Sequence, residues 1–412
     1  MIESRSFTLP NGLRVVHNHD DATAMIAMTV LYNVGARDES PDATGMAHLF
    51  EHLMFGGSVN VPDYDASMEI AGGWNNAWTN NDYTNFYDVI PAVNAETAFW
   101  LESDRMLGLA FSEKALEVQR NVVIEEFKQV CLNKPYGDIA HLLRPLVYNI
   151  HPYRWPTIGK EISHIERITN DDLKAFFYGH YAPNNAVLAI SGNISFDDVR
   201  SLAEKWFGSI PRRDIQPRTY APELPIESAR RLEVTRNVPH TTIAIAFPMC
   251  GYDSPEYASA DIVTDILSTG RSSRFYRELV MGSDLFIDAD ASILGSDEPG
   301  YLLINGKLRK DSPTAIAEAE KAIYQQLDRI STYEPSEYEL TRAVNKFESS
   351  YTFGTINFIS KSQALAISAM HRENVNDIVP RYRALTPADI TKTASKILNR
   401  NSSATLVYHP IK

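Results

Sequence analysis

Two histidines and a glutamate within five residues carry the clearest chemical signal in this chain. Residues 48–52 read His-Leu-Phe-Glu-His. On a helix, the four-residue step from His48 to His52 places both imidazoles on one face, with the Glu51 carboxylate alongside. Two neutral imidazoles can bind a zinc ion, and a neighbouring carboxylate can accept a proton from a zinc-bound water. The spacing therefore predicts a hydrolytic zinc centre built on one helix.

A helix face that carries polar groups by chance is the alternative interpretation. The rest of the run argues against it because the other side chains are apolar: Met46, Ala47, Leu49, Phe50, Leu53, Met54 and Phe55. Two imidazoles and a carboxylate among such side chains are costly to remove from water without a partner, and a bound metal removes that cost. Gly56 and Gly57 are expected to end the helix.

A catalytic zinc requires three protein ligands and one open position, so a third ligand must come from elsewhere in the chain. Residues 117–130 have helical propensity, contain neither Gly nor Pro, and present two adjacent carboxylates, Glu125 and Glu126. These carboxylates point about 100° apart on a helix. Glu126 shares its face with the valines at 122, 123 and 130. This pattern favours Glu126 as the inward-facing ligand and Glu125 as a solvated neighbour.

The composition is that of a globular protein, with 412 residues, 44% hydrophobic and 22% charged. The chain is too long for one ordinary core and fits about two to four αβ units. The net charge of −13 argues against nucleic-acid binding, since a phosphate backbone requires a basic stripe. Cys131 and Cys250 lie far apart, which argues against a disulfide framework and a thiolate zinc site.

No targeting or membrane segment is recognisable in the sequence. The first ten residues lack the apolar stretch of a signal peptide, and no apolar run reaches transmembrane length. We therefore expect a cytoplasmic protein without a membrane partner; a periplasmic location would require a leader that has been removed.

The order of expected elements repeats along the chain. Two β-type runs around an Asn11-Gly12 turn and a strand near 25–34 precede the histidine-bearing helix. Strands at about 231–235 and 241–247 likewise precede a helix from about Glu256. Residues 261–270 align with residues 48–57 through their apolar positions and closing glycine. This indicates a duplicated unit in which Asp261, Thr264 and Asp265 have replaced His48, Glu51 and His52.

Both halves mix strands with helices, which indicates an α+β fold. Four helices are expected near the end of the chain, at 314–330, 337–351, 358–370 and 387–398. We expect two homologous αβ domains, each an antiparallel sheet with packed helices. They are residues 1–210 with the metal motif and residues 230–412 without it, joined by a linker at 211–229 that is rich in Pro, Arg and Glu.

Five segments, in order along the first half, resemble the pitrilysin and mitochondrial processing peptidase family, the main group of inverzincins, whose motif is H-x-x-E-H. They are residues 8–16, 45–57, 72–87, 120–127 and 178–193; the second half matches more loosely, around 267–280. The resemblance implies a zinc-dependent endopeptidase for short or unfolded peptides, with a chamber between two clam-like halves. It implies that His48, His52 and Glu126 bind one zinc ion and that Glu51 activates the water.

The resemblance also implies a substrate-binding strand. The segment around Asn75, Asn76 and Ala77 is expected to present an exposed edge that pairs with an extended peptide. From the residues alone, Gly72 to Thr79 would be a plain turn entering a strand.

Two places depart from the family's pattern. Gln119 stands where many relatives have a glutamate, seven residues before the zinc-binding one. An amide can still support a ligand by a hydrogen bond, so we expect tuning of the site rather than its loss. Val280 and Ile287 stand where active relatives have an Arg and a Tyr that orient the substrate, and neither side chain can donate a hydrogen bond.

We therefore expect a homologous partner subunit that supplies the Arg and the Tyr. A homodimer is the alternative, although a symmetric pair would still lack these donors. The competing function is a non-catalytic scaffold or chaperone-like subunit of the same fold, but such relatives usually have a broken zinc motif.

Two other groups carry weaker signals. His17 and His19 share one face of an expected strand, which a solvated face explains better than a second metal site. The run from Arg271 to Arg274, Arg-Ser-Ser-Arg, is compatible with an anion-binding turn or with the serine-capped start of a helix.

Overall fold

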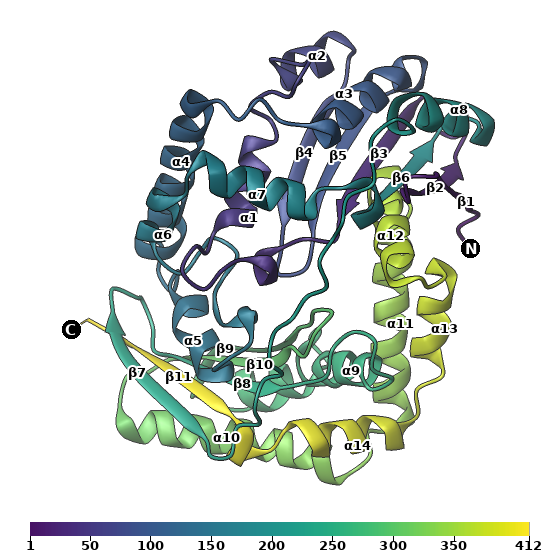
Figure 1. The fold of residues 1–412 in the computed structure, drawn as a ribbon. Coiled ribbons are helices and arrows are strands. Elements are labelled where there is room, and N and C mark those ends of the chain that lie inside the picture. Colours follow the sequence, from purple (N-terminus) through teal and green to yellow (C-terminus); the bar gives the residue numbers. More distant parts are fainter. Residues whose placement is uncertain (412) are drawn as a thin grey trace. The chain divides into compact units, whose positions relative to one another are not determined.

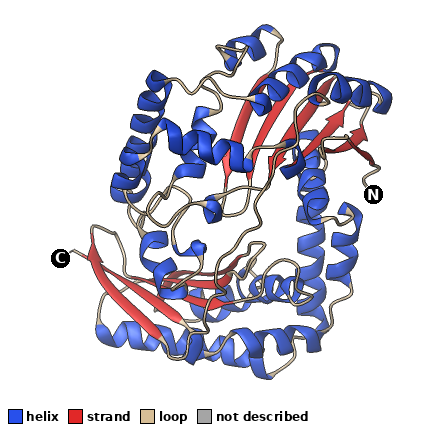
Figure 2. Ribbon diagram, viewed as in Figure 1, coloured by secondary structure: helices blue, strands red, loops and turns tan. Residues whose placement is uncertain are grey.

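The computed structural model describes residues 1–411, in which strands and helices follow one another mostly in runs (Figures 1 and 2). The strands are β1 (Arg5–Thr8), β2 (Arg14–His19), β3 (Met25–Tyr32), β4 (Trp74–Thr79), β5 (Thr84–Pro91), β6 (Ala186–Gly192), β7 (Arg230–Arg236), β8 (Thr242–Pro248), β9 (Phe286–Leu294), β10 (Tyr301–Leu308) and β11 (Ala404–Pro410). The helices are α1 (Met46–Leu53), α2 (Tyr64–Ile70), α3 (Ala95–Leu107), α4 (Glu113–Phe127), α5 (Ile139–Val147), α6 (Ile162–Arg167), α7 (Asn170–His180), α8 (Phe196–Phe207), α9 (Tyr257–Ser268), α10 (Pro313–Thr332), α11 (Glu337–Gly354), α12 (Phe358–His371), α13 (Ile378–Arg383) and α14 (Pro387–Ile397).

The contacts divide the chain into two compact units, each discontinuous in sequence. Unit 1 comprises Met1–Phe127, Pro156–Tyr220 and Tyr351–Ile378, and unit 2 comprises Lys128–Trp155, Ala221–Ser350 and Val379–Lys412. The expected boundaries near residues 210 and 230 do not describe these units, because each unit includes a segment from the other half of the chain. The division of the sequence itself into two homologous halves stays a prediction.

The sheet of unit 1 has six strands in the order β1-β2-β6-β3-β5-β4. All neighbours are antiparallel except β2 and β6, so the expected antiparallel sheet is in fact mixed. Helix α12 packs on one part of the sheet, against β2, β3 and β6, while α3 and α8 contact β5 and β2. β3 and β6 are buried along nearly their whole length, which is why both read as almost continuous apolar runs.

The sheet of unit 2 repeats this arrangement with five strands, β7-β11-β8-β10-β9. It also has one parallel pair, β7 with β11, at the place that β2 and β6 occupy in unit 1. Helix α9 follows β8 as α1 follows β3. The shared strand order supports the duplication inferred from ten aligned residues, and the fold is α+β in both units, as expected.

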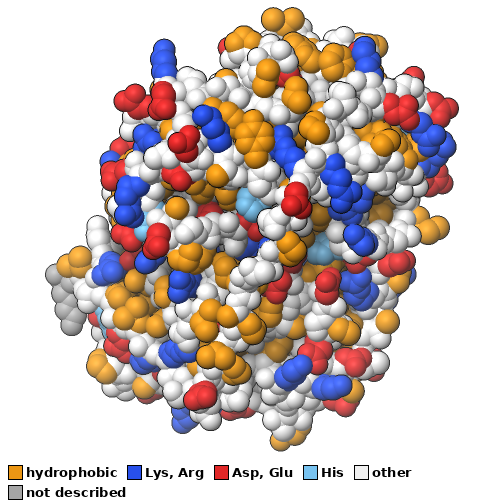
Figure 3. All heavy atoms as spheres, in the orientation of Figure 1, with side chains coloured by type: hydrophobic (Ala, Val, Ile, Leu, Met, Phe, Trp, Pro, Cys, Tyr) orange, Lys and Arg blue, Asp and Glu red, His pale blue; other side chains and the backbone are white. Residues whose placement is uncertain are grey.

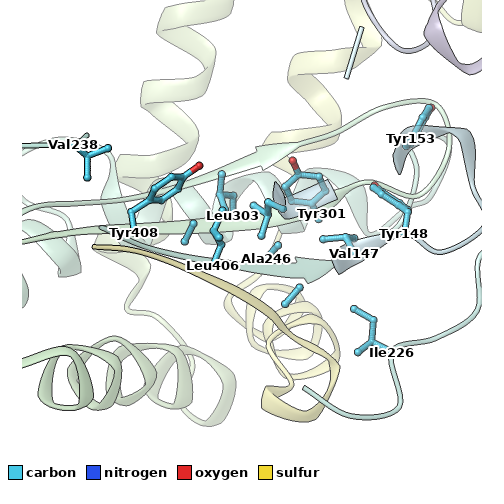
Figure 4. Packing of buried hydrophobic residues seen from close by; sticks show 13 residues of the cluster. Val147, Tyr148, Tyr153, Ile226, Val238, Ala246, Tyr301, Leu303, Leu406 and Tyr408 are labelled. Carbon is cyan, nitrogen blue, oxygen red and sulfur yellow. The ribbon is translucent and has the colours of Figure 1, made fainter. Parts of the chain in front are cut away.

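Each sheet takes a covering helix from the other half of the sequence. α12, from the second half, packs on the sheet of unit 1, and α5, from the first half, packs on β8, β11 and β7 of unit 2. Figure 4 shows the result in unit 2, where Val147 at the end of α5 belongs to the same buried cluster as Ala246 and Tyr301 from the strands. Full burial of one such side chain contributes about 1.5–3 kcal/mol.

Among the described helices, none combines the length and the apolar character that a membrane span requires. On the face drawn in Figure 3, acidic and basic side chains are interspersed. This face therefore lacks the basic stripe that a phosphate backbone would need.

Candidate metal centre

Helix α1 begins without a capping side chain of its own. Its N-cap is Gly45, whose φ of +87° is a left-handed conformation, and a Cβ there would lie 3.0 Å from the carbonyl oxygen of Ile158. The buried carboxylate of Glu39 accepts hydrogen bonds from the backbone N–H groups of Gly45 and Ala47, each at 2.9 Å. Glu39 thus satisfies two of the free donors at the start of the helix and places a negative charge at its positive end.

The apolar face of α1 fixes the direction of its polar face. Leu49 and Phe50 are fully buried, and the ring of Phe50 stacks on Tyr181 with centroids 4.6 Å apart. Burial of this apolar face leaves the opposite face of α1, which carries the histidines, directed toward α4.

His48, His52 and Glu126 converge, although they come from two helices. The imidazole centroids are 4.9 Å apart, and the Nε2 atoms of His48 and His52 lie 3.7 and 3.5 Å from Oε2 of Glu126. One potential ligand atom from each residue lies within 4.8 Å of the others. Among the described residues, this is the one group of three or more His, Cys, Asp or Glu that could hold a metal.

The geometry of this group fits zinc. Tetrahedral zinc with bonds of about 2.0–2.1 Å sets neighbouring ligand atoms about 3.4 Å apart, close to the two separations from Glu126. Both separations exceed the usual length of a hydrogen bond. Burial lowers the pKa of His48 to about 4, so its imidazole is neutral, as a metal ligand must be. Two nitrogens and one carboxylate oxygen are a donor set that catalytic zinc sites use.

The electrostatics of His52 differ from those of His48. Burial lowers the pKa of His52, but the contact with Glu126 and the charge of Glu51 outweigh it, and the net pKa is raised. The contact with His52 in turn lowers the pKa of Glu126. The pair therefore keeps Glu126 ionised. The other nitrogen of His48, Nδ1, is buried and has no hydrogen-bond partner among the described residues.

Glu51 lies next to this group and is held by a residue that sequence reasoning missed. Burial raises its pKa, and the hydrogen bond from Thr79 Oγ1, 2.5 Å from Oε2, partly opposes the shift. Thr79 is the last residue of β4. A carboxylate with a raised pKa is a better proton acceptor, which suits a general base. The only signal for Thr79 was its position within the segment 72–87 that resembles the family.

Gln119 and Glu125 lie as expected, but part of the reasoning about their helix was wrong. Gln119 lies two turns before Glu126 on α4 and hydrogen-bonds to His52, so it contacts a proposed metal ligand without being one itself. Glu125 is exposed. The valines that marked the face of Glu126 as inward are not all buried: Val123 is, whereas Val122 and Val130 are 46% and 44% exposed. α4 packs through Leu116, Val123 and Phe127 instead.

Asn75, Asn76 and Ala77 lie on β4, which is an edge strand that pairs only with β5. The side chain of Asn75 donates to Asp65 of α2 at 2.9 Å. The backbone N–H of Ala77 donates to the side-chain oxygen of its neighbour Asn76 at 2.8 Å. The plain-turn alternative applies only to Gly72 and Gly73, since the strand begins at Trp74.

The positions that depart from the family's pattern lie in unit 2. Val280 ends a short π-helix, Phe275–Val280, and Ile287 lies on β9; both are half-buried. Arg274, the nearest arginine before Val280 with a buried side chain, is paired with Glu339 through two hydrogen bonds of 2.8 and 3.2 Å. The guanidinium of Arg274 is therefore paired with that carboxylate, whereas Arg271 is exposed, so both interpretations of the 271–274 turn stay predictions.

The other candidate groups have structural contacts. Both His17 and His19 hydrogen-bond to the carbonyl oxygen of Ile194, at 2.9 and 3.0 Å, and His17 is buried, so the solvated-face interpretation was wrong for His17. On α9, Asp261 accepts a hydrogen bond from Tyr382 at 2.8 Å, and Asp265 accepts one from Thr269 at 2.6 Å.

The fold is that of a family of peptidases. The model of Insulinase (Peptidase family M16) matches residues 14–155, and that of Peptidase M16 inactive domain matches residues 167–347. The chain belongs to peptidase family M16, which confirms the family resemblance inferred from the sequence.

Named relatives match this chain over different lengths. The zinc protease PqqE of Helicobacter pylori is 28% identical over 418 residues, covering 98% of this chain and 92% of that protein. The mitochondrial-processing peptidase subunit beta of Saccharomyces cerevisiae is 27% identical over 260 residues, covering 62% of this chain and 56% of that protein. The crystal structure of a protease from Helicobacter pylori has the same fold, with a TM-score of 0.92 over the whole of both chains at 24% identity.

Proposed function

We propose that this chain is a zinc-dependent endopeptidase that cleaves short or unfolded peptides. The observation that carries the proposal is the convergence of His48, His52 and Glu126 beside the buried carboxylate of Glu51. Zinc, when bound there, supplies a Lewis acid that polarises the water and the scissile carbonyl. The relatives' name of zinc protease agrees with this assignment.

The side chains of this chain divide the remaining work. The imidazoles of His48 and His52 and the Glu126 carboxylate would hold the metal, and Gln119 would orient His52 by its hydrogen bond. Glu51 takes the proton from the attacking water and delivers it to the leaving amine. The hydrogen bond from Thr79 fixes one carboxylate oxygen of Glu51, Oε2, and leaves Oε1 for the proton.

The substrate is proposed to bind as an added strand along β4. An edge strand presents unpaired backbone groups that an extended peptide can pair with. At Ala77 the side chain of Asn76 now accepts the backbone N–H that a substrate carbonyl would accept. Asn76 therefore keeps this donor satisfied until a peptide displaces its side chain.

The metal assignment is tested by removing and returning zinc. Chelation should abolish peptide hydrolysis, and zinc should restore it. Glu126→Gln should lower the bound zinc far more than Glu125→Gln, the matched control one residue away on the exposed face. If Glu125→Gln loses the metal and Glu126→Gln keeps it, the ligand assignment is wrong.

We further propose that this chain is the zinc-carrying subunit of a two-subunit enzyme. Val280 and Ile287 cannot donate the hydrogen bonds expected at their positions, and Arg274 is held by Glu339. Such donors are worth about 3–4 kcal/mol each in the transition state. The yeast relative is named as a subunit, and the expected partner is a homologous chain that supplies the Arg and the Tyr.

The partner proposal is tested within this chain. The double variant Val280→Arg, Ile287→Tyr should hydrolyse a fluorogenic peptide faster than the isolated wild type, by at least about tenfold if either donor is restored. The pair Val280→Leu, Ile287→Leu is the control. Wild-type hydrolysis that is already fast in the isolated chain would refute the need for a partner.

The second candidate function, a non-catalytic scaffold or chaperone-like subunit, rests on the same two apolar side chains. It predicts bound zinc without hydrolysis, both in the wild type and in the Val280→Arg, Ile287→Tyr variant. The cytoplasmic location stays a prediction.

A further inference from the structure

A second concave site lies on unit 1, at the opposite edge of its sheet from β4. It is a groove of about 490 Å³ between the strands β1 and β2 and the C-terminal end of α12 with the turn Val375–Asp377 that follows. α12 packs on β2, β6 and β3, and β1 lies one strand beyond β2. The face of β1 is therefore left open beside the end of the helix, where α12 and β1 appear near the N-terminus in Figure 1.

The lining combines hydroxyl groups, cations and an apolar floor. Ser4, Ser6 and Thr8 alternate along the β1 segment, so their side chains share one face. Arg14 of β2 and Arg372 after α12 bring two guanidinium groups. The floor is apolar and buried, and consists of Val16, Leu365 and Val375.

The positive charge in the groove is only partly compensated. Arg14 donates to the carbonyl oxygen of Ala369 and lies 3.2 Å from the sulfur of Met370, and neither partner carries a charge. Burial and the nearby charge of Arg372 lower the pKa of Arg14. Glu373 is the one acid in the lining, so two cations face one anion, in a protein whose net charge is −13.

Arg372 has an unfavourable backbone conformation that suggests a use for its side chain. It is the C-cap of α12, with φ of 59° and ψ of 32°, in the left-handed region. Glycine is the common residue at such helix ends because a Cβ is disfavoured in this conformation. Backbone strain of this kind is found at functional sites, where the side chain has a role that glycine could not fill. The side chain of Arg372 lines the groove.

We propose that this groove binds a small molecule that carries an oxyanion group, a carboxylate or a phosphate, between the guanidinium groups of Arg14 and Arg372. Guanidinium groups bind both kinds of oxyanion through charge-assisted hydrogen bonds. The hydroxyls of Ser6 and Thr8 offer further donors, and the apolar floor accommodates the rest of the ligand. The volume lies within the range of small-molecule sites. This site is separate from the proposed peptidase function.

The test is calorimetric titration of the full chain at low ionic strength with two probes, inorganic phosphate and hexanoate. We expect one or both to bind, and expect Arg14→Gln and Arg372→Gly each to weaken binding by about tenfold or more. Arg5→Gln is the matched control, because Arg5 lies on β1 with Ser6 and Thr8 but its guanidinium stacks on the ring of Phe196, 3.7 Å from the centroid. The control should bind both probes like the wild type.

The glycine variant separates binding from folding. Glycine adopts a positive φ without strain, so Arg372→Gly should unfold at the same temperature as the wild type or higher. Binding of phosphate alone or of hexanoate alone supports the site and identifies the source of the oxyanion. The proposal is overturned if neither probe binds more tightly than about 10 mM, or if Arg14→Gln and Arg372→Gly bind like the wild type. It is equally overturned if Arg5→Gln weakens binding as much as they do.

Discussion

Glu39 should control the metal centre without touching it. Its carboxylate accepts two hydrogen bonds from the first turn of α1, and the N-cap Gly45 has no side chain that could replace it. In Glu39→Gln the amide oxygen can still accept a hydrogen bond from one backbone N–H group. The amide NH₂ group faces the other backbone N–H group and cannot accept its hydrogen bond. Hydrogen bonds to a charged group contribute about 1.5–3 kcal/mol each, so we expect a loss of about 2–4 kcal/mol in unfolding free energy.

The loss should be seen in two measurements. The unfolding temperature should fall by several degrees, given about 2–4 °C per kcal/mol for a unit of this size. Zinc affinity should fall as well. Without the cap, part of the free energy of zinc binding is used to order α1, and the measured affinity is lower by that amount. Calorimetry of the zinc-free and zinc-loaded protein measures both, with Glu125→Gln as the control for loss of one surface charge. An unchanged unfolding temperature and zinc affinity in Glu39→Gln would refute the role of Glu39 as the cap.

Three further predictions concern stability. Gly45→Ala should destabilise the protein by at least about 1 kcal/mol in thermal unfolding, because alanine is strained at a φ of +87°. Burial raises the pKa of Asp261 from 3.8 to about 6, so its stabilising contribution is present below pH 3.8 and lost as the pH rises through 6. Asp261→Asn should therefore stabilise the protein at pH 8 by up to about 3 kcal/mol and leave it unchanged near pH 4. Burial opposes ionisation of Glu339, but the hydrogen bond from Arg274 prevails and lowers its pKa from 4.5 to about 2. The stabilising contribution of ionised Glu339 is present above pH 4.5 and is lost as the pH falls toward 2. In Glu339→Gln the free energy of unfolding should therefore decrease less with falling pH over this range. Equal pH profiles for either variant and the wild type would contradict the corresponding pKa shift.

Local spacing was sufficient to predict the parts of the site that lie on one element. The four-residue step from His48 to His52 requires only a helix, and the apolar run around it supplies one. The helices expected at 358–370 and 387–398 begin and end within one residue of α12 and α14. The alternation of apolar and polar residues thus predicted elements well, since it depends on local periodicity.

Contacts between distant elements could not be predicted in this way. Glu126 was favoured partly because valines on its face suggested burial. Val122 and Val130 are exposed, so that part of the reasoning was wrong although Glu126 does lie beside His48 and His52. Glu39 and Thr79 depend on how the chain folds back before α1 and at the end of β4, which no spacing encodes. The same holds for α5 and α12, each of which covers the sheet formed by the other half of the sequence. An amphipathic helix carries no signal for which sheet it covers.

Hydrolysis of a fluorogenic peptide by zinc-loaded wild type and by Glu51→Gln, with zinc measured in the same samples, tests the proposed peptidase most directly. Glu51 is not one of the three proposed ligands, so both proteins should hold about one zinc per chain. The amide cannot accept the proton of the water, and the rate should fall by about 10²–10⁴. Hydrolysis by Glu51→Gln at the wild-type rate, or no hydrolysis by the zinc-loaded wild type above background, would contradict the proposal.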